Sequence, residues 1–343
     1  MGPRIFFHIE GQMRKQIYVL VLILITVIGF GIAGFSDGVN AGSFVRDGIG
    51  AHAFGMGGAF VSIADGVCTT LWNPAGLAQL DGINVGGMYT DKFGQGIYFQ
   101  SVGATMRISD FGAGLTMARS SIEDIPFYGG DEDGFFSETQ TLLLGSVGYD
   151  LDGVIELQTG PISALLVGGN VKYYSHSLLE GKGQGFGFDL SLLMKLSFDW
   201  GTLNVGFNSL DIGGTALKWT GTDHNPVNNV PWINKIGASV GLLDSTLRVA
   251  TDVDLAMSDS GLNRFHIGAE YWPVEQLGLR AGLILASDGS RQFSAGATAS
   301  WHGLTIDYAF VPHQALGSSH ILSAQFHFAG WWNEEDEAKQ DVQ

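Results

Sequence analysis

Seven ionisable residues recur at alternate positions in the last third of the chain, and their types could neutralise one another or select what passes along a path. They are Arg248, Asp252, Asp254, His266, Glu270, Arg280 and Asp307. They alternate with mostly apolar neighbours, which puts them on the polar, inward face of extended strands. Buried charges must be paired or hydrated, so one interpretation is a neutralising network. The other is a lumen polar cluster that selects what passes, and the sequence leaves both open.

Other kinds of chemistry find little support in the sequence. Cys68 is the only cysteine, so the chain has no internal disulfide and no cysteine metal cluster. Nucleotide-binding loops, hydrolase elbows and paired metal-ligand motifs are missing, and we expect no catalytic activity, no metal and no cofactor. The 34 acidic residues outnumber the 17 basic ones, for a formal net charge of -17. This charge argues against non-specific binding of nucleic acid.

Long alternating segments must position these side chains. In "STLRVATDVDLA" and "GFGFDLSLLMKLSF" the apolar residues occupy every second position over roughly 10 to 15 residues. Strands of soluble proteins average about 5–6 residues, whereas a tilted strand that crosses a bilayer needs about 9–11. The sequence therefore predicts an all-β fold, a transmembrane antiparallel β-barrel of about 14 strands over residues 83–328. The predicted strands are 83–90, 96–108, 111–120, 138–149, 161–177, 184–198, 201–211, 231–242, 245–256, 263–273, 277–287, 290–300, 303–311 and 318–328.

The connections give the barrel an orientation. Tight turns such as "DWGT", "LLDS", "PVEQ" and "WHG" alternate with long loops around 121–137 and 212–230. Short turns of outer-membrane barrels face the periplasm and longer loops face outward. We therefore expect a multi-pass protein of the bacterial outer membrane with both mature termini in the periplasm.

Tryptophans mark the expected membrane interfaces, where aromatic belts form. Trp200, Trp272 and Trp301 stand at the tight-turn ends of predicted strands, so we expect them in one belt. Trp219 and Trp232 stand in or beside the 212–230 loop, which predicts the opposite belt.

Both ends of the chain carry signals of their own. Arg14 and Lys15 precede "QIYVLVLILITVIGFGIAG", an apolar stretch that ends in small residues. This order is typical of a secretory signal peptide, which we predict, with an upstream extension, over residues 1–41. A membrane anchor is the alternative. Residues 329–343 include the acidic run "NEEDE" and are expected to form a solvated periplasmic tail.

A compact, glycine-rich segment at 42–82 stands between the signal and the first strand. Asn73 is a good helix N-cap and Pro74 suits the first helical position, so "NPAGLAQL" predicts a helix start. The run "AFVSIAD" is apolar enough to need burial, and the glycines permit tight folding. We predict a hatch, or plug, in the barrel lumen, with a cap outside the barrel as the alternative. The candidate hatch residues are Gly55, Gly57, Gly58, Asp65, Trp72, Asn73, Pro74, Ala75 and Gly76.

The stretch "GAHAFGMGGAFVSIADGVCTTLWNPAGLA" followed by a barrel, together with "DYAFVPHQALGSSHILSAQFHF", resembles the FadL-type outer-membrane transporters of hydrophobic compounds. It is equally similar to the PorV/PorQ barrels associated with type IX secretion. The resemblance to the transporters implies a barrel of fourteen strands with an N-terminal hatch, whose Asn-Pro-Ala run matches Asn73, Pro74 and Ala75. It also implies a substrate that leaves sideways through the wall, and a gap near 111–120 would support such an exit.

Two functions follow as alternatives. The first is passive transport of hydrophobic, fatty-acid-like small molecules across the outer membrane, gated by movement of the hatch. The second is a PorV-like role in protein secretion or surface attachment, with exported proteins bound by the loops at 121–137 and 212–230. Expected partners are outer-membrane lipid, the barrel assembly machinery, and either a hydrophobic small-molecule ligand or a secreted protein. Phe326 and Phe328 end the last strand and resemble the signal that the assembly machinery reads.

Overall fold

The computed structural model describes residues 43–128, 134–152, 161–222, 224–257 and 263–328. The predicted signal peptide at 1–41 and the acidic tail at 329–343 lie outside these residues. Among the described residues, no helix is both long and apolar enough to span a membrane.

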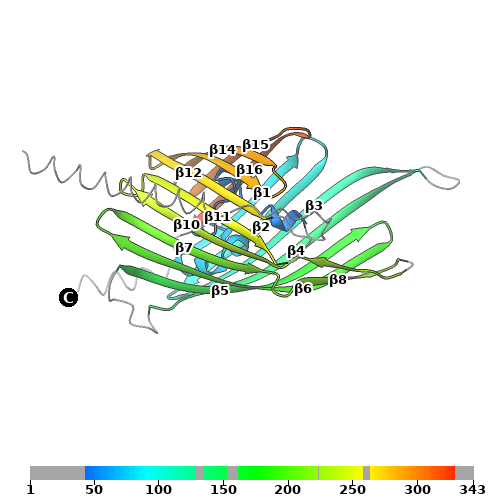
Figure 1. Ribbon diagram of the computed structural model, residues 1–343, viewed down its shortest axis with the longest axis horizontal. Helices are drawn as coiled ribbons and strands as arrows, with labels where there is room; N and C mark the ends of the chain where they lie inside the picture. The colour runs from blue at the N-terminus through cyan, green and yellow to red at the C-terminus, as the bar shows by residue number, and fades with distance from the viewer. Residues whose placement is uncertain (1–42, 129–133, 153–160, 223, 258–262, 329–343) are drawn as a thin grey trace, which may run out of the picture.

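Sixteen strands in the described residues join in one antiparallel sheet. Fourteen of them close into a barrel, because β5 pairs with β6 as well as with β4 (Figure 1). This confirms the predicted all-β antiparallel barrel. The strands are β1 (Ile83–Lys92), β2 (Ile97–Ile108), β3 (Phe111–Phe127), β4 (Gly134–Asp150), β5 (Ile162–Leu178), β6 (Gly181–Phe198), β7 (Gly201–Leu210), β8 (Thr215–Thr220), β9 (Val227–Val230), β10 (Ile233–Leu242), β11 (Leu247–Ala256), β12 (Arg264–Val274), β13 (Leu277–Ala286), β14 (Arg291–Trp301), β15 (Leu304–His313) and β16 (Gly317–Phe328).

The two predicted long loops are where the sequence-based boundaries were wrong. Most of 121–137 is strand, because β3 and β4 run for 17 residues each. The pairing of β3 with β4 shifts register between Ile122 and Ile125, so a bulge absorbs the acidic residues Glu123 and Asp124 within the strand. The 212–230 region contains the hairpin of β8 and β9, and β8 pairs with β6.

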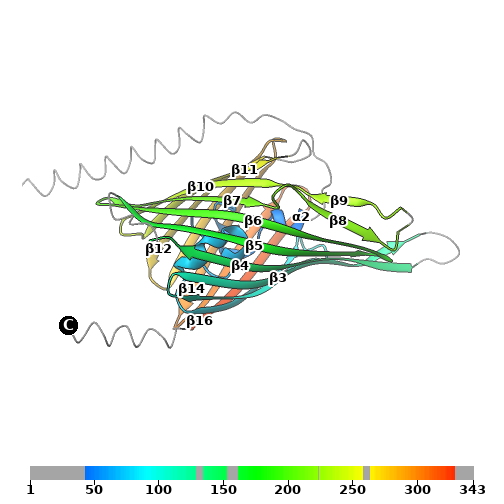
Figure 2. The ribbon, with the colours of Figure 1, turned by 90° about the horizontal axis from the view of Figure 1, so that it is seen from below.

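The strands extend to different lengths at the two ends of the barrel. We call the end with the turns at 109–110, 199–200, 275–276 and 302–303 the turn end, and the opposite end the loop end. At the loop end β3, β4, β5 and β6 extend well beyond the other strands, together with β8 and β9 (Figure 2). Regular strands, rather than long loops, therefore build most of this side.

The outward face of the barrel is apolar. Large side chains such as Leu115, Leu190 and Phe293 are exposed at 71%, 62% and 60% of their surface. They alternate with buried residues along β3, β6 and β14. An apolar outer band of this kind is what a barrel in a bilayer requires, whereas a protein in water rarely exposes so much contiguous apolar surface.

The predicted tryptophan belts need correction. Trp272 lines the interior, because it lies two residues after the inward-facing Glu270 and strand side chains alternate. Trp219 is buried against the ring of His176, since β8 folds against β6. Trp232 is half-buried and donates its indole N–H to the Ser209 hydroxyl.

The N-terminal segment, residues 43–82, lies against the inner surface of the sheet (Figure 1). It contains three short α-helices and a 3-10 helix. Helix α3 contacts β13–β16, whereas η1 contacts β2–β6, so the segment reaches opposite sides of the barrel. Ala53, Met56 and Phe60 are fully buried there. The elements are α2 (Ser43–Arg46), α3 (Ala51–Gly55), α4 (Thr69–Trp72) and η1 (Pro74–Gln79).

Candidate functional site

A cavity of about 250 Å³ lies at the loop end, between the N-terminal segment and the strands β1 and β12–β16. We call it the loop-side cavity. Its apolar lining includes Phe54, Trp72, Phe93, Val311 and Ile321. A cavity of about 150 Å³ is enough to hold benzene, so this one has room for a single ring or a short chain.

Basic side chains outnumber acidic ones around the loop-side cavity. Arg46, Lys92, Arg264 and Arg291 line it together with one carboxylate, Asp47. Asp47 is 2.5 Å from the Lys92 ammonium and 3.4 Å from the Arg264 guanidinium. Burial raises the pKa of Asp47, but these two cations outweigh it and bring the pKa to about 2. Asp47 is therefore ionised at neutral pH, and the lining keeps a net positive charge.

A second cavity of about 180 Å³ lies toward the turn end, against the same strands. We call it the turn-side cavity. Its lining is more polar and includes Thr298, Ser300, Thr305 and Gln325. Cys68 also lines it, half-buried, with its thiol donating to the Asp65 carbonyl oxygen at 3.2 Å. Burial, followed by the charges of nearby Asp65 and Asp307, raises the pKa of this thiol.

Four of the predicted cluster residues form one chain of ion pairs beside the turn-side cavity. Glu270 is 3.3 Å from Arg248 and 2.8 Å from Arg280, and Arg280 is 3.0 Å from Asp307. His52 of α3 joins this chain, because its Nε2 lies 2.9 Å from Glu270. No periodic pattern marks His52, which belongs to the N-terminal segment.

The other three cluster residues contact the N-terminal segment or one another. Asp252 accepts the backbone N–H groups of Phe60 and Val61 at 2.7 and 2.8 Å. His266 lies 2.7 Å from the Gly57 carbonyl oxygen and 3.2 Å from Asp254. Asp254 is also 2.7 Å from Lys235, which the predicted cluster did not include. The charged residues therefore pair with one another and fasten the segment to the wall.

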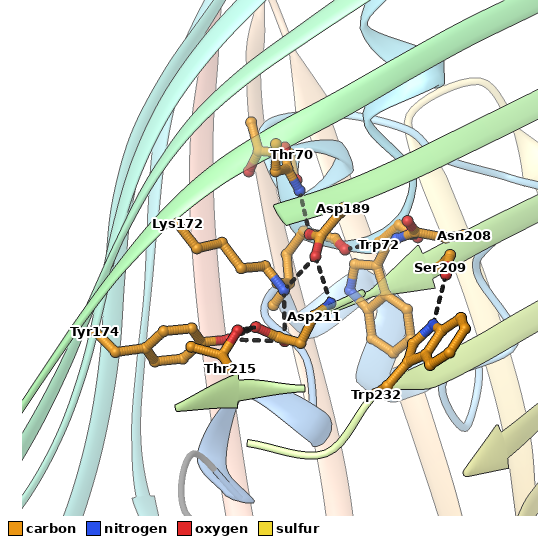
Figure 3. Close-up of polar contacts among 12 residues, drawn as sticks. Thr70, Trp72, Lys172, Tyr174, Asp189, Asn208, Ser209, Asp211, Thr215 and Trp232 are labelled. Atoms are coloured by element: carbon orange, nitrogen blue, oxygen red, sulfur yellow. Dashed lines mark hydrogen bonds and ion pairs between the residues drawn. The ribbon is translucent and has the colours of Figure 1, made fainter. Parts of the chain in front are cut away.

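A separate buried group holds the segment on the opposite wall (Figure 3). The Lys172 ammonium lies 2.8 Å from Asp189 and 2.9 Å from Asp211. Asn170 donates to both Asp189 and the Thr70 carbonyl oxygen of α4, at 2.7 and 2.9 Å. Alternation along β5 and β6 places Lys172 and Asp189 inward, but Asp211 follows β7 in a turn that no periodicity marks.

The Asn-Pro run begins a helix as predicted. Asn73 is fully buried, and its side-chain oxygen accepts the Ala75 N–H at 3.2 Å, while Pro74 takes the first helical position. The Asn73 amide also donates to the carbonyl oxygens of Val61 and Leu192, at 2.8 and 3.1 Å. The helix is of the 3-10 type, which the sequence did not distinguish from an α-helix.

The remaining candidate hatch residues differ in their surroundings. Trp72 is buried and donates its indole N–H to the Ile49 carbonyl oxygen at 2.8 Å. Asp65 is exposed and caps only the neighbouring Gly66 N–H. A β-carbon on Gly76 would overlap Ala64. Gly55, Gly57 and Gly58 lie against β12–β14. The Ala75 N–H also reaches the Ser191 hydroxyl at 2.9 Å.

The barrel wall is closed over residues 111–120, where a gap would support a lateral exit. Over the described residues 111–122, β3 pairs with β2 on one side and with β4 on the other without interruption. The register shift in this strand comes later, beyond Ile122. Among the described residues, moreover, no group of His, Cys, Asp and Glu side chains is arranged to hold a metal ion.

Comparison with known proteins identifies solved structures that have a similar fold. No protein-family model and no curated protein sequence matches the chain. The toluene transporter TbuX of Ralstonia pickettii matches in structure with a TM-score of 0.54, at 14% identity, over 83% of this chain and 100% of that one. The P. putida toluene transporter TodX matches with a TM-score of 0.55, at 14% identity, over 82% and 99% of the two chains. CymD, a monoaromatic hydrocarbon channel, matches with a TM-score of 0.54, at 13% identity, over 82% and 98%.

These three proteins are FadL-type barrels. Because identities of 13–14% support a likeness in fold alone, the PorV/PorQ resemblance gains nothing from them. The chain shares the barrel fold of these transporters, and this likeness in fold agrees with the resemblance to FadL-type barrels predicted from the sequence.

Proposed function

We propose that this protein is an outer-membrane channel for small hydrophobic molecules that carry an acidic group, and not an enzyme. The loop-side cavity carries the proposal. It combines an apolar lining, large enough for one ring or a short chain, with an excess of basic side chains. The structurally similar TbuX and TodX are toluene transporters, which supports a hydrophobic cargo.

The basic lining favours a fatty-acid-like ligand over a neutral hydrocarbon. An anion gains charge-assisted hydrogen bonds from Lys92 or Arg264, which a hydrocarbon cannot make. The apolar part of the ligand would contact Phe54, Val311 and Ile321. The predicted hatch residues, Gly55 to Gly76, would gate this path, and the lumen polar cluster would hold the hatch against the wall.

Ligand binding tests this proposal. Octanesulfonate is an anion with a short apolar chain, and octanol is its neutral counterpart. With the protein in lipid nanodiscs, calorimetry is expected to show tighter binding of octanesulfonate than of octanol. Lys92→Gln should weaken octanesulfonate binding about tenfold, since a hydrogen bond to a charged group contributes about 1.5–3 kcal/mol.

Lys182→Gln is the matched control, because Lys182 is exposed near the same end of the barrel and does not line the cavity. It is expected to leave binding unchanged. Equal binding of octanol and octanesulfonate, or equal effects of the two lysine substitutions, would contradict the proposed ligand class.

The orientation belongs to the same proposal. We infer that the turn end faces the periplasm, as do both mature termini. The apolar outer band supports a membrane location. An epitope inserted in the turn at 93–96, between β1 and β2 at the loop end, should then be accessible on intact cells. Access only after the outer membrane is permeabilised would reverse the orientation.

One observation supports a second candidate function, a PorV-like role in secretion. Tyr128 and Phe135 on the extended hairpin of β3 and β4 are exposed at 78% and 74%. Aromatic residues in such positions are typical anchors for a protein partner. Recovery of a secreted protein with the purified barrel, lost on Tyr128→Ser with Phe135→Ser, would favour this role.

A further inference from the structure

The two cavities are in line along the same part of the wall, and a narrow band of small residues separates them. On β13 the loop-side cavity is lined by Ile284 and the turn-side cavity by Arg280, with Gly282 between them. On β14 Gly296 separates the two linings in the same way, as Ala309 does on β15. The wall itself therefore leaves space between the cavities.

Helix α3 and the residues after it fill that space. A β-carbon on Gly296 would lie 3.1 Å from the Cα of Gly55, and one on Gly282 would overlap the Gly57 amide nitrogen. On β12, a β-carbon on Gly268 would contact the Met56 carbonyl oxygen. The band is thus recessed to receive the backbone of Gly55–Gly57, which closes the passage in this structure.

Each cavity reaches toward its own end of the barrel. Arg291 and His313, which line the loop-side cavity, are exposed at the loop end. Ser300 and Thr305 line the turn-side cavity and are half-exposed, next to the turn at 302–303. If α3 alone moved away from the wall, the two cavities would therefore connect and form a path between the two ends of the barrel.

Three side-chain contacts hold α3 against the barrel wall. It is held by the Ala51 N–H on the Ser323 hydroxyl at 2.7 Å, by the Ser294 hydroxyl on the Gly55 carbonyl oxygen at 3.2 Å, and by His52 on Glu270. Glycines with positive φ stand on both sides of it, Gly50 at 93° and Gly57 at 64°. Such positions can absorb the backbone rotation of a hinge.

The charge of the lining also differs between the two cavities. The turn-side cavity contains two carboxylates, Asp65 and Asp307, beside one guanidinium, Arg280, whereas the loop-side lining is basic. An anion would therefore be held at the loop end and released from the turn-side cavity. Binding that is favourable on entry and weak on exit is what conduction requires.

We propose that the ligand crosses the barrel along its axis, from the loop-side to the turn-side cavity past Gly282, Gly296 and Ala309, when α3 withdraws. The turn-side cavity is then a transit site for the same amphipathic anions. The uninterrupted pairing of β3 supports this axial route over a lateral one. This inference rests on the proposed function.

A reversible cross-link tests the movement of α3. Ala51→Cys and Ser323→Cys, in a Cys68→Ser background, put two thiols on residues that are in contact through the Ala51 N–H and the Ser323 hydroxyl. In proteoliposomes, oxidation is expected to stop the efflux of trapped octanesulfonate and reduction to restore it, with binding in the loop-side cavity unchanged. If oxidation leaves the efflux rate unchanged although mass spectrometry shows that the disulfide has formed, the proposal that α3 must move is wrong.

Filling the turn-side cavity tests the route. Thr305→Trp projects into that cavity, and Ile306→Trp is its control, because Ile306 is the next residue on the outward face. Thr305→Trp should reduce efflux toward that of protein-free vesicles without weakening octanesulfonate binding. Efflux equal to that of Ile306→Trp would mean that the ligand leaves elsewhere. If the wild type does not bind octanesulfonate at all, the proposed function fails first, and this inference with it.

Discussion

Gly57 and Gly282 lie so close that a β-carbon on Gly282 would overlap the amide nitrogen of Gly57. The first belongs to the turn after α3 and the second to the middle of β13. Their contact lies between the two cavities, where the backbone of the N-terminal segment packs directly against the wall. A residue with any side chain at either position would separate the segment from the wall.

Gly282→Ala is therefore expected to lower the free energy of unfolding by about 1–3 kcal/mol, as other overpacked sites do, and to raise the leak of octanesulfonate. The added methyl group meets backbone atoms of Met56 and Gly57, which cannot rotate away. Urea unfolding in lipid vesicles and efflux measurements check the two effects. Gly145→Ala is the control, because its β-carbon would have no neighbour nearer than 3.9 Å. Identical behaviour of the two variants would contradict the tight contact.

Lys172→Met should cost about 3–5 kcal/mol of stability, because it leaves two buried carboxylates without their cation. Asp189 and Asp211 both contact this ammonium, which is completely buried (Figure 3). Adding Asp211→Asn to Lys172→Met should recover part of the loss, since one buried negative charge is then removed. The exposed Lys182→Met is the control and should stay near wild type. Urea unfolding measures all four proteins, and a double variant no more stable than Lys172→Met would argue against the charge explanation.

The Cys68 thiol should react slowly with iodoacetamide at neutral pH. Its pKa is raised, so the reactive thiolate is scarce until the pH is well above the usual range of cysteine. The alkylation rate, followed by mass spectrometry, should therefore keep rising at pH values where the urea-unfolded chain has already reached its plateau. A folded protein that reaches its plateau at the same pH as the unfolded chain would contradict this environment.

The barrel could be predicted from the sequence because the alternation of apolar and polar residues that marks its strands is a local pattern. Alternation in β11 or β15 needs only neighbouring residues to be recognised, and all the predicted strands correspond to strands of the barrel in the same order. The full length of β3 could not be predicted, because its bulge beyond Ile122 places acidic residues and Pro126 within the strand. The aromatic-belt rule places Trp272 at the membrane interface, but Trp272 shares the inward face of β12 with Glu270.

The candidate site was harder to predict, because it depends on where the N-terminal segment lies. Alternation identified Asp252 and His266 as inward-facing, but not their bonds to the backbone of Val61 and Gly57. The two cavities exist only because α3 lies across the wall between them. Such contacts join residues about 200 positions apart, and neither periodicity nor spacing encodes them.

Efflux from proteoliposomes tests the central claim most directly. Vesicles containing the wild-type protein are expected to lose trapped octanesulfonate much faster than protein-free vesicles, and to retain glucose, which has neither an apolar chain nor a charge. Added octanesulfonate outside should saturate the exchange, as a binding site on the path requires. Octanesulfonate that leaves no faster than from protein-free vesicles, or together with glucose, would contradict a selective channel for amphipathic anions.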